Sequence, residues 1–447
     1  MKSAAYYFIG IGGIGMSSIA RFLLQQGFIV GGYDKTPSPI TNALIEEGAS
    51  VVYDSSVAAL PAAFKSLSTK VIYTPAIPEG HPQKDFFVQQ GNDVVKRSVY
   101  LGELSRGKTT LAVAGTHGKT TTTAILAHLF SSLEQSFTAF VGGVMNTKKS
   151  NLLSTGLDTI LVEADEFDRS FLQLTPAIGC ITSVDADHLD IYGTKEEVLD
   201  AYAAFSAQIT GVRIVEKEVP LDGLTYSIKE KADYYASAIM PKGFGYEFDL
   251  HTPTGQYSKV YFNQLGLHNL SNAIAAFAMS SQFGLPEKQL CQSLATFGGV
   301  ERRLQLMLST PSHLLIDDYA HHPTEIKAVV ETLEDAYPGE KKCVVFQPHL
   351  FSRTKDFLAD FATALSGFDR VILLPIYPAR ERPIPGVTSS VLADRISSKT
   401  RVSCIEKTEL IASIAHYPER IKVILGAGDI GLELTSIINK LKADEKS

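Results

Sequence analysis

Short apolar runs alternate with longer helix-like stretches along the first hundred residues. The runs AYYFIGIGG, FIVGGYD and VIYTPAI have the length of strands, and MSSIARFLLQQG, after the first of them, predicts a helix that ends at Gly27. Strands that alternate with helices in this way are typical of a parallel, doubly wound sheet. The pattern therefore predicts an α/β fold for this part of the chain.

The same alternation begins again near residue 107 and once more near residue 304. The second stretch contains KTTLAVAG, TILVEADE, AIGCITSVDADH and the apolar helix HNLSNAIAAFAMSSQFG. The third contains HLLIDDYAHHP, KKCVVFQPH, DRVILLPIY and KVILGAGD. A chain of 447 residues is long for one core and suits two or three domains. We predict three α/β domains, at residues 1–105, 106–303 and 304–447.

Composition and charge narrow the class of protein. Hydrophobic residues make up 45% of the chain, charged residues make up 20%, and the net charge is −7. This composition is ordinary for a soluble globular protein, and the negative charge argues against a nucleic-acid partner. No apolar run approaches about 20 residues, so we expect no membrane-spanning segment and a cytoplasmic location. The four cysteines lie far apart without a CxxC pair, which argues against a zinc knuckle and fits a reducing compartment.

A glycine-rich turn follows the first predicted strand. Gly10, Gly12 and Gly15 have the spacing G-x-G-x-x-G directly before a helix, with Gly13 and Ile14 inside the turn. This spacing lets backbone N–H groups and a helix dipole meet a diphosphate. Asp34 ends the next strand, where an acid that binds a ribose would lie. The turn predicts a diphosphate ligand, although the same pattern also serves plain packing of a helix on a strand.

A second glycine loop, AVAGTHGKTTT, lies between the apolar run TTLAVA and the helix-like TTTAILAHLF. Strand, glycine loop, lysine, threonine and helix is the order of a phosphate-binding loop, but GxxxxGK[ST] would place a glycine at Val113. Lys119 can reach the β- and γ-phosphates of a nucleotide, and the hydroxyl of Thr120 can bind Mg²⁺. The predicted loop comprises Gly115, Thr116, His117, Gly118, Lys119, Thr120 and Thr121.

Further ligands of a magnesium ion are expected at the ends of strands that face the same edge of the sheet. Glu163 ends the strand TILVE, and His188 follows the strand IGCITSV, so we predict both as metal ligands. Either residue could instead have a structural part, as a helix cap or a hydrogen-bonding histidine. The neighbouring acids Asp165, Glu166 and Asp168 are expected to be solvated charges outside the site.

Two further clusters carry polar side chains at helix starts and strand ends. In GLHNLSNA, an asparagine can pair with the donor and acceptor edge of adenine, although a helix cap is the alternative. In DDYAHHPTE and FQPHLFSRTKDF, acids, histidines and an arginine follow two strands, as in a binding crevice. The residues in these clusters are His268, Asn269, Asn272, Asp317, Asp318, Tyr319, His321, His322, His349 and Arg353.

Taken in order, these motifs resemble those of the Mur ligases of peptidoglycan synthesis. GIGGIGMS, GTHGKTTT, VEADE, DADHLDIYG, GLHNLSNA, VERRL and DDYAHHPTE cover nearly the whole chain, and the short phosphate loop is also the form typical of that family. The resemblance implies a Rossmann-like first domain that binds a UDP substrate, a central ATPase domain and a Rossmann-like last domain that binds an amino acid. GIGGIGM and DDYAHHPTE are most similar to members that join L-alanine to UDP-N-acetylmuramate.

The resemblance also implies a function for individual residues. Lys119 and Thr120 match the phosphate-loop pair, Glu163 and His188 match magnesium ligands, and Asn269 and Asn272 match the asparagines that contact adenine. Arg303 matches an arginine that contacts ATP, and Asp318 matches the acid near the ribose. His321 and Arg353 match positions near the incoming amino acid, whereas Leu350 stands where these relatives often have a basic residue. We place no carbamylated lysine in GVRIVEKEV.

The reaction implied is an ATP-dependent condensation of a carboxylate with an amine in cell-wall synthesis, and hence in cell shape and division. The carboxylate attacks the γ-phosphorus of ATP, and the amine then displaces phosphate from the acyl phosphate. Lys119, His188 and His321 are the predicted catalytic residues, with His321 as the base. Three alternatives stay open: a sister ligase that adds a preformed peptide, a nicotinamide-dependent oxidoreductase, and a protein that hydrolyses ATP to move domains.

Overall fold

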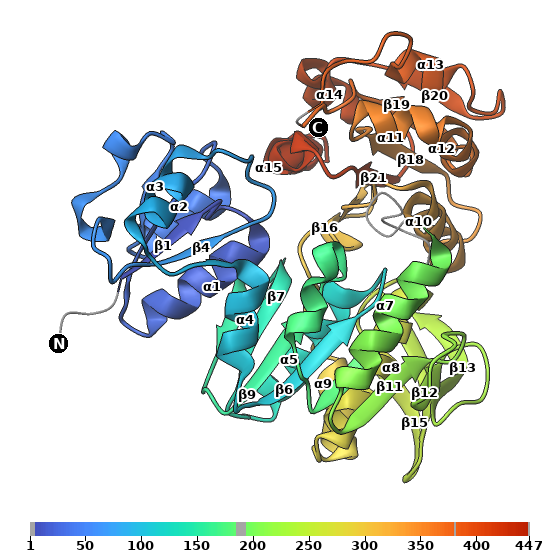
Figure 1. The fold of residues 1–447 in the computed structure, drawn as a ribbon. Helices are drawn as coiled ribbons and strands as arrows, with labels where there is room; N and C mark the ends of the chain where they lie inside the picture. Colours follow the sequence, from blue (N-terminus) through green and yellow to red (C-terminus); the bar gives the residue numbers. More distant parts are fainter. Residues whose placement is uncertain (1–4, 185–193, 380, 446–447) are drawn as a thin grey trace. The chain divides into compact units, whose positions relative to one another are not determined.

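The computed structural model describes residues 5–184, 194–379 and 381–445, and these residues form three separate sheets. Figure 1 shows them with their helices, coloured along the sequence. The chain divides into two compact units, each continuous in space but not in sequence. Unit 1 comprises residues 1–239, 248–262 and 271–298, and unit 2 comprises residues 240–247, 263–270 and 299–447.

The first sheet is parallel and has five strands. Its strands, in the order in which they are hydrogen-bonded, are β3 (Ser50–Val52), β2 (Ile29–Tyr33), β1 (Ala5–Ile9), β4 (Lys70–Tyr73) and β5 (Val94–Lys96). The helices are α1 (Ile14–Gln25), α2 (Pro39–Glu46), η1 (Val57–Ala59), η2 (Ala62–Phe64), α3 (Pro82–Gln90) and α4 (Arg97–Ser105). The expected alternation is confirmed, but the third predicted strand is shorter than VIYTPAI because the chain leaves the sheet after Tyr73.

The central sheet has ten strands. Their order is β15 (Gly255–Phe262), β14 (Gly245–Thr252), β13 (Tyr234–Lys242), β12 (Leu224–Ser227), β11 (Val212–Glu216), β10 (Ile178–Ile181), β6 (Thr109–Ala114), β9 (Thr159–Glu163), β7 (Thr138–Met145) and β8 (Ser150–Ser154). The helices are α5 (Lys119–Ser132), η3 (Phe167–Gln173), α7 (Lys195–Gln208), α8 (Leu267–Gln282) and α9 (Glu287–Leu294).

The register of the central strands decides which side chains share an edge. In parallel pairing, Val113 of β6 lies opposite Glu163 of β9, and Ala114 lies opposite Ile181 of β10. The loops that follow these three strands therefore leave the sheet at the same edge, as the sequence-based argument requires.

The third sheet has six strands and belongs to unit 2. Its order is β16 (Gln305–Ser309), β17 (Leu314–Asp318), β21 (Ile421–Leu425), β18 (Lys342–Phe346), β19 (Arg370–Leu373) and β20 (Arg401–Cys404), and the pair β16–β17 is antiparallel. The helices are α10 (Pro323–Ala336), α11 (Phe351–Asp356), α12 (Leu358–Leu365), α13 (Ser389–Ala393), α14 (Lys407–Ile414), η4 (Asp429–Glu433) and α15 (Leu434–Asp444).

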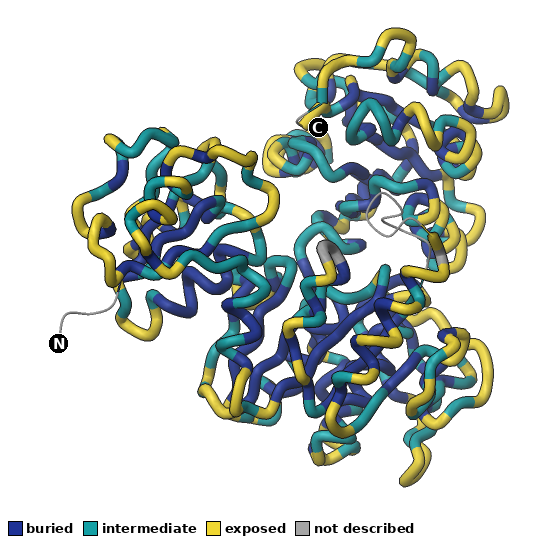
Figure 2. The backbone as a smooth tube through the Cα atoms, viewed as in Figure 1, coloured by how far each residue is buried: buried dark blue, intermediate teal, exposed yellow. Residues whose placement is uncertain are grey.

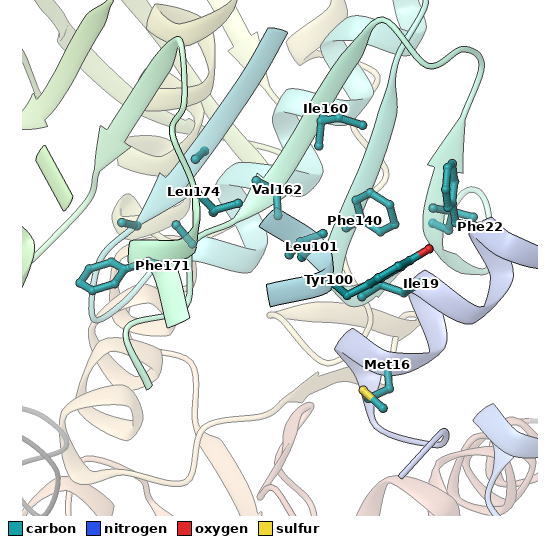
Figure 3. Packing of buried hydrophobic residues seen from close by; sticks show 14 of the residues in the cluster. Met16, Ile19, Phe22, Tyr100, Leu101, Phe140, Ile160, Val162, Phe171 and Leu174 are labelled. Atoms are coloured by element: carbon teal, nitrogen blue, oxygen red, sulfur yellow. The ribbon is translucent and has the colours of Figure 1, made fainter. Parts of the chain in front are cut away.

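Within unit 1, the first and central sheets share one apolar core. Figure 3 shows Phe22 of α1 near Phe140 of β7, whose ring centroids lie 5.6 Å apart, and Tyr100 and Leu101 of α4 in the same cluster. Burying one such side chain contributes roughly 1.5–3 kcal/mol. The first sheet is therefore anchored to the central one by much more than the covalent linker.

A buried polar cluster joins the same two elements. The guanidinium of Arg21 on α1 donates to Asn151 of β8 and pairs with Glu47 at 2.8 Å. The amide of Asn151 in turn donates to the carbonyl oxygen of Ile14 at 2.6 Å and to the hydroxyl of Ser17. Each buried polar group of this contact thus has a partner, which its burial requires.

Burial follows the sheets in all three regions. In Figure 2 the buried residues, in dark blue, run along the strands, and the exposed residues, in yellow, gather on helix surfaces and loops. Parallel strands covered by helices on both faces are expected to show this distribution. Among the described helices, none combines the length and the apolar composition needed to cross a membrane.

Candidate active site

The first glycine turn is held by the strand beside it. The N–H groups of Gly10 and Ile11 donate to the carbonyl oxygen of Tyr33, and Gly10 has φ +90°, a conformation that favours glycine. The N–H of Gly12 donates to the carboxylate of Asp34 at 2.7 Å. Gly13 then precedes the helix α1. Asp34 directly follows β2, and its carboxylate stabilises the turn. That it binds a ribose stays a prediction.

The phosphate loop connects β6 with α5, and the two residues after the neighbouring strand β10 hold it in place. The N–H of Thr116 donates to the carbonyl oxygen of Ser183 at 3.1 Å, and the N–H of His117 donates to its hydroxyl at 2.9 Å. The hydroxyl of Thr182 donates to the carbonyl oxygen of Ala114. Because these two loop N–H groups are occupied, the start of α5 is where a phosphate would find backbone donors.

Lys119, the first residue of α5, reaches back over the loop. Its ammonium donates to the carbonyl oxygen of Gly115 at 2.6 Å and to the carboxylate of Glu166 at 2.8 Å. Only 4% of the Glu166 side chain is exposed, so the prediction that this acid is a solvated charge is wrong. The burial raises the pKa of Glu166, while the nearby ammonium of Lys119 opposes the shift.

Glu163 and Thr120 meet at the same edge of the sheet. The carboxylate of Glu163 accepts a hydrogen bond from the N–H of Gly142 at 2.6 Å. Burial raises the pKa of Glu163, and the opposing influences include the Gly142 N–H, the charge of Lys119 and a hydrogen bond from the hydroxyl of Thr120. A carboxylate and a hydroxyl are oxygen donors, which suit Mg²⁺.

The third predicted metal ligand, His188, lies outside the described residues. Within residues 5–184, 194–379 and 381–445, no group of three or more His, Cys, Asp or Glu side chains forms a metal site. Glu163 and Thr120 are therefore the two predicted ligands whose proximity the structure describes.

Of the two asparagines predicted to contact adenine, Asn272 lies against the phosphate loop. Gly118 has φ +86°, and a methyl group added there would collide with the side-chain oxygen of Asn272. This close approach requires glycine at position 118. Asn269, three residues earlier on α8, donates from its side chain to the carbonyl oxygen of Leu265 at 2.7 Å and is 3% exposed. Its side chain thus has a structural partner of its own.

Two further predicted nucleotide contacts, Arg303 and Asp318, lie in unit 2, as Asn269 does. The carboxylate of Asp318 accepts hydrogen bonds from the N–H groups of Leu304 and Ala320, both at 2.7 Å. Burial raises its pKa to about 6, although the charge of Arg303 acts in the opposite direction. The guanidinium of Arg303 lies 5.5 Å from the ring centre of Tyr319. Asp318 therefore fixes the loop that carries Arg303, whatever ligand it also meets.

The residues predicted to meet the amino acid form a second cluster in unit 2. The His321 and His349 rings are 6.1 Å apart, and the guanidinium of Arg353 lies 3.5 Å from Nδ1 of His349. Nδ1 of His321 lies 2.9 Å from the carbonyl oxygen of Tyr319. A carbonyl oxygen only accepts, so Nδ1 carries the proton, and Nε2 holds the lone pair in the neutral ring. Burial lowers the pKa of His321, which favours that neutral form.

Comparison with protein families identifies all three regions. The model described as Mur ligase family, catalytic domain, matches residues 5–109, the Mur ligase middle domain matches residues 113–280, and the Mur ligase glutamate ligase domain matches residues 302–432. A UDP-N-acetylmuramate–L-alanine ligase of Christiangramia forsetii is 45% identical over 97% of this chain and 96% of its own length. The chain belongs to the Mur ligase family.

Other relatives of this Mur ligase agree in length and fold. A UDP-N-acetylmuramate–L-alanine ligase of Parabacteroides distasonis is 43% identical, covering 96% of this chain and 95% of its own. The crystal structure of a UDP-N-acetylmuramate–alanine ligase of Thermotoga maritima has a TM-score of 0.85 at 26% identity and covers 98% of this chain and 99% of that one. A murein peptide ligase of Psychrobacter arcticus shares the fold, with a TM-score of 0.69 at 20% identity over 98% and 99% of the chains. The predicted three-domain α/β fold is thus confirmed.

Several residues of this Mur ligase site were missed by sequence reasoning. Thr182 and Ser183 hold the phosphate loop, yet a Thr-Ser pair after a strand has no distinctive pattern. Glu166 belongs to a group of acids that the sequence predicts to be solvated charges. Its position three residues after Glu163, at the end of a strand beside a phosphate loop, was the signal that could have found it.

Proposed function

We propose that this protein is an ATP-dependent ligase that joins L-alanine to the carboxylate of UDP-N-acetylmuramate in the synthesis of the peptidoglycan precursor. The observation that carries the proposal is the relatives' shared name. Relatives that are 40–45% identical over at least 95% of the chain are all UDP-N-acetylmuramate–L-alanine ligases. The phosphate loop with Lys119, Thr120 and Glu163 supplies the machinery that such a reaction needs.

The first step activates the carboxylate. Its oxygen forms a bond to the γ-phosphorus of ATP, the bond to the bridging oxygen of the β-phosphate breaks, and ADP and an acyl phosphate result. Phosphoryl transfer depends mainly on positioning and on neutralisation of charge. Lys119 supplies positive charge at the phosphate loop, and Glu166 holds its ammonium there.

Magnesium would be held by Thr120 and Glu163, with His188 as a further predicted ligand. When bound, the ion neutralises charge on the phosphates. The role of the protein is to fix the oxygens: the N–H of Gly142 orients the carboxylate of Glu163. Such support of a ligand from a second residue commonly accompanies metal sites.

In the second step the amine of L-alanine adds to the acyl carbon, and phosphate leaves. The amine must first lose a proton, because an ammonium group has no lone pair. His321 is suited to accept this proton through Nε2, since Nδ1 is engaged by Tyr319 and the lowered pKa keeps the ring neutral. Arg353 supplies a cation for the carboxylate of the amino acid. Good alignment of the reacting groups can be worth ~7–11 kcal/mol.

The three predicted domains then divide the substrates among them. Residues 1–105 bind the UDP substrate at the Gly10–Gly15 turn, residues 106–303 bind ATP at the phosphate loop, and residues 304–447 bind the amino acid. Asn269 and Asn272 are proposed to contact the adenine of ATP and Asp318 its ribose. Arg303 is a further proposed contact of ATP. The reaction takes place in the cytoplasm, with ATP and Mg²⁺ as the cofactors.

A panel of acceptors tests this function. The enzyme is given ATP, Mg²⁺ and UDP-N-acetylmuramate with single amino acids or short peptides, and phosphate release and product mass are followed. We expect release only when L-alanine accompanies the sugar nucleotide, and a product heavier by one alanyl residue. Condensation of a preformed peptide instead of alanine, hydrolysis of ATP without condensation, or oxidation of a nicotinamide cofactor would each contradict the proposal.

A further inference from the structure

Arg97 lies between the first glycine turn and the acids that follow β9. It is the first residue of α4, directly after β5, which is the second strand from the one that carries the Gly10–Gly15 turn. Parallel strands end at one edge of the sheet, so the start of α4 and the turn share that edge. Arg97 is not among the residues that the sequence motifs single out.

One side of the guanidinium lies against the glycine turn. A methyl group added to Gly15 would lie 2.5 Å from Nη1 of Arg97 and 3.2 Å from Cζ. Glycine at position 15 therefore leaves the space that the guanidinium fills. In a turn of this type, the last glycine lies next to the helix start on which a diphosphate is expected.

The other side of the guanidinium is held by an acid of the central domain. Nη2 of Arg97 pairs with the carboxylate of Asp165 at 3.3 Å. Arg97 and Asp165 line a small hollow together with Ser98 and Glu163, the predicted metal ligand. Nη2 is thus engaged by Asp165, whereas Nη1 faces the glycine turn.

The backbone that carries Arg97 is fixed by packing. Tyr100 and Leu101 belong to the core shared by the two sheets (Figure 3), and a methyl group on Gly102 would lie 2.6 Å from the carbonyl oxygen of Gln173. Helix α4 therefore lies tightly against η3, and the backbone at Arg97, the first residue of α4, is held in a fixed position. A side chain held in this way loses little entropy when it binds a ligand.

We propose that Arg97 positions the UDP substrate by binding its diphosphate through the Nη1 side of the guanidinium, with Asp165 orienting the opposite side. This inference rests on the proposed function, because it assumes a UDP-sugar at the first turn. A planar guanidinium matches the oxygens of a phosphate in two parallel hydrogen bonds, which a lysine cannot do. The arrangement ties the substrate's diphosphate to the edge of the central sheet where the carboxylate must meet ATP.

The test compares Arg97→Gln, Arg97→Lys and Asp165→Asn with a matched control, Arg106→Gln. Arg106 follows the last residue of the same helix, and its side chain is exposed. Binding of UDP, uridine and ADP is measured by calorimetry, and the KM values for UDP-N-acetylmuramate, ATP and L-alanine are measured on the full chain. Thermal melting shows whether each variant is folded.

We expect Arg97→Gln to weaken UDP binding and to raise the KM for UDP-N-acetylmuramate by roughly 10- to 100-fold, as loss of a charged hydrogen bond predicts. Uridine and ADP binding and the KM for ATP should stay within about twofold. Arg97→Lys should recover part of the UDP affinity by charge alone. Asp165→Asn should weaken UDP binding less than Arg97→Gln, and Arg106→Gln should have no effect.

Three results would overturn the assignment. Unchanged UDP affinity with weaker UDP-N-acetylmuramate binding would place Arg97 at the carboxylate of the sugar instead. Weaker ADP binding would place it at the ATP site. An equal rise in all three KM values, with a lower melting temperature, would indicate a purely structural ion pair. If the wild-type enzyme does not condense L-alanine at all, the proposed function fails; if it does and Arg97→Gln binds UDP normally, only this inference fails.

Discussion

The two glycine turns of unit 1 have the same order of strand, loop and helix, but their acidic neighbours act differently. In the first turn, the carboxylate of Asp34 accepts hydrogen bonds from the N–H groups of Gly12 and Lys35. Its negative charge therefore interacts with backbone groups. In the phosphate loop, Glu166 pairs with the ammonium of Lys119, a side chain that can change partners. The acid of the first turn therefore stabilises the backbone, whereas the acid of the phosphate loop holds a cation that we propose acts on the nucleotide phosphates.

The two loops are supported alike, by the end of a neighbouring strand. N–H groups of the first turn donate to Tyr33, the last residue of β2, and N–H groups of the phosphate loop donate to Ser183, just after β10. The acids beside the two loops differ. Burial raises the pKa of both Glu163 and Glu166 beside the phosphate loop. Perturbed acids that cluster around one lysine are typical of catalytic sites, although ion-pair networks also produce them.

The substitution Lys119→Ala should show the largest difference between the two glycine turns, because it should lower kcat without changing the affinity for UDP-N-acetylmuramate. We expect kcat to fall by roughly 10³-fold or more, because the transferred phosphoryl group loses its fixed positive charge. The affinity for UDP-N-acetylmuramate should be unchanged in calorimetry, since the first turn does not use this lysine. Lys65→Ala, at an exposed position, is the control. Loss of sugar-nucleotide binding in Lys119→Ala would remove the distinction between the turns.

The substitution Glu163→Gln should increase the concentration of Mg²⁺ that the enzyme needs for activity. The amide keeps the shape but not the charge, so the Mg²⁺ concentration for half-maximal activity should rise by roughly 10- to 100-fold. A titration of activity against Mg²⁺, with Mn²⁺ in parallel, measures the change. Glu46→Gln, an exposed acid on α2, should leave the titration as it is. An unaltered Mg²⁺ requirement in Glu163→Gln would exclude this residue as a ligand.

Glu166→Gln should have a smaller effect, on the order of tenfold in kcat, because one charge-assisted hydrogen bond to Lys119 is lost. In the wild type, burial raises the pKa of Glu166, so protonation begins at a higher pH than for an ordinary glutamate. Activity should therefore fall as the pH is lowered through this raised pKa. The fall in kcat should be shallower in Glu166→Gln, in which one titrating group is absent. An acid limb of identical steepness would count against Glu166.

The substitution Asp34→Ala should have the smallest effect, limited to stability and to binding of the sugar nucleotide at the first turn. Removing the acceptor of the Gly12 N–H should lower the free energy of unfolding by about 1 kcal/mol and raise the KM for the sugar nucleotide several-fold. The KM for ATP should stay the same. Asp34→Asn keeps an oxygen that accepts the same hydrogen bond and should lie close to the wild type. If Asp34→Ala affected ATP and sugar nucleotide equally, the two turns would not be independent.

Much of this architecture follows from local sequence patterns. Several strands, namely β1, β6, β17 and β18, consist largely of apolar residues and are followed directly by a motif. The strand and the motif after it could therefore be predicted together. The sequence patterns did not predict the strands β3, β5, β7, β8, β11–β16 and β20. They include runs such as GYEFDLHT, in which polar and apolar residues alternate and which become strands only through pairing with neighbours.

The site was predictable where a residue belongs to a spaced motif and not where it depends on distant contacts. Lys119, Thr120 and Glu163 come together because the parallel strands β6 and β9 end at one edge. Glu166 and Arg97 were missed because their proposed roles depend on burial and on partners far away in the sequence. Glu166 pairs with Lys119, 47 positions away, and Arg97 pairs with Asp165, 68 positions away. No local pattern reveals such contacts. The side chain of His322, which the sequence only groups with the other polar residues after this strand, accepts a hydrogen bond from the N–H of Thr324 and caps α10.

The contact between Arg21 and Asn151 has a practical consequence for anyone who wishes to divide the protein. A chain cut after residue 105 would leave Arg21 with Glu47 but without Asn151. It would also expose the ring of Phe22 in one fragment and that of Phe140 in the other. We expect neither half to fold stably or stay soluble alone, whereas the two halves produced together should associate. Co-expression of the halves, followed by copurification through a tag on one of them, would show it.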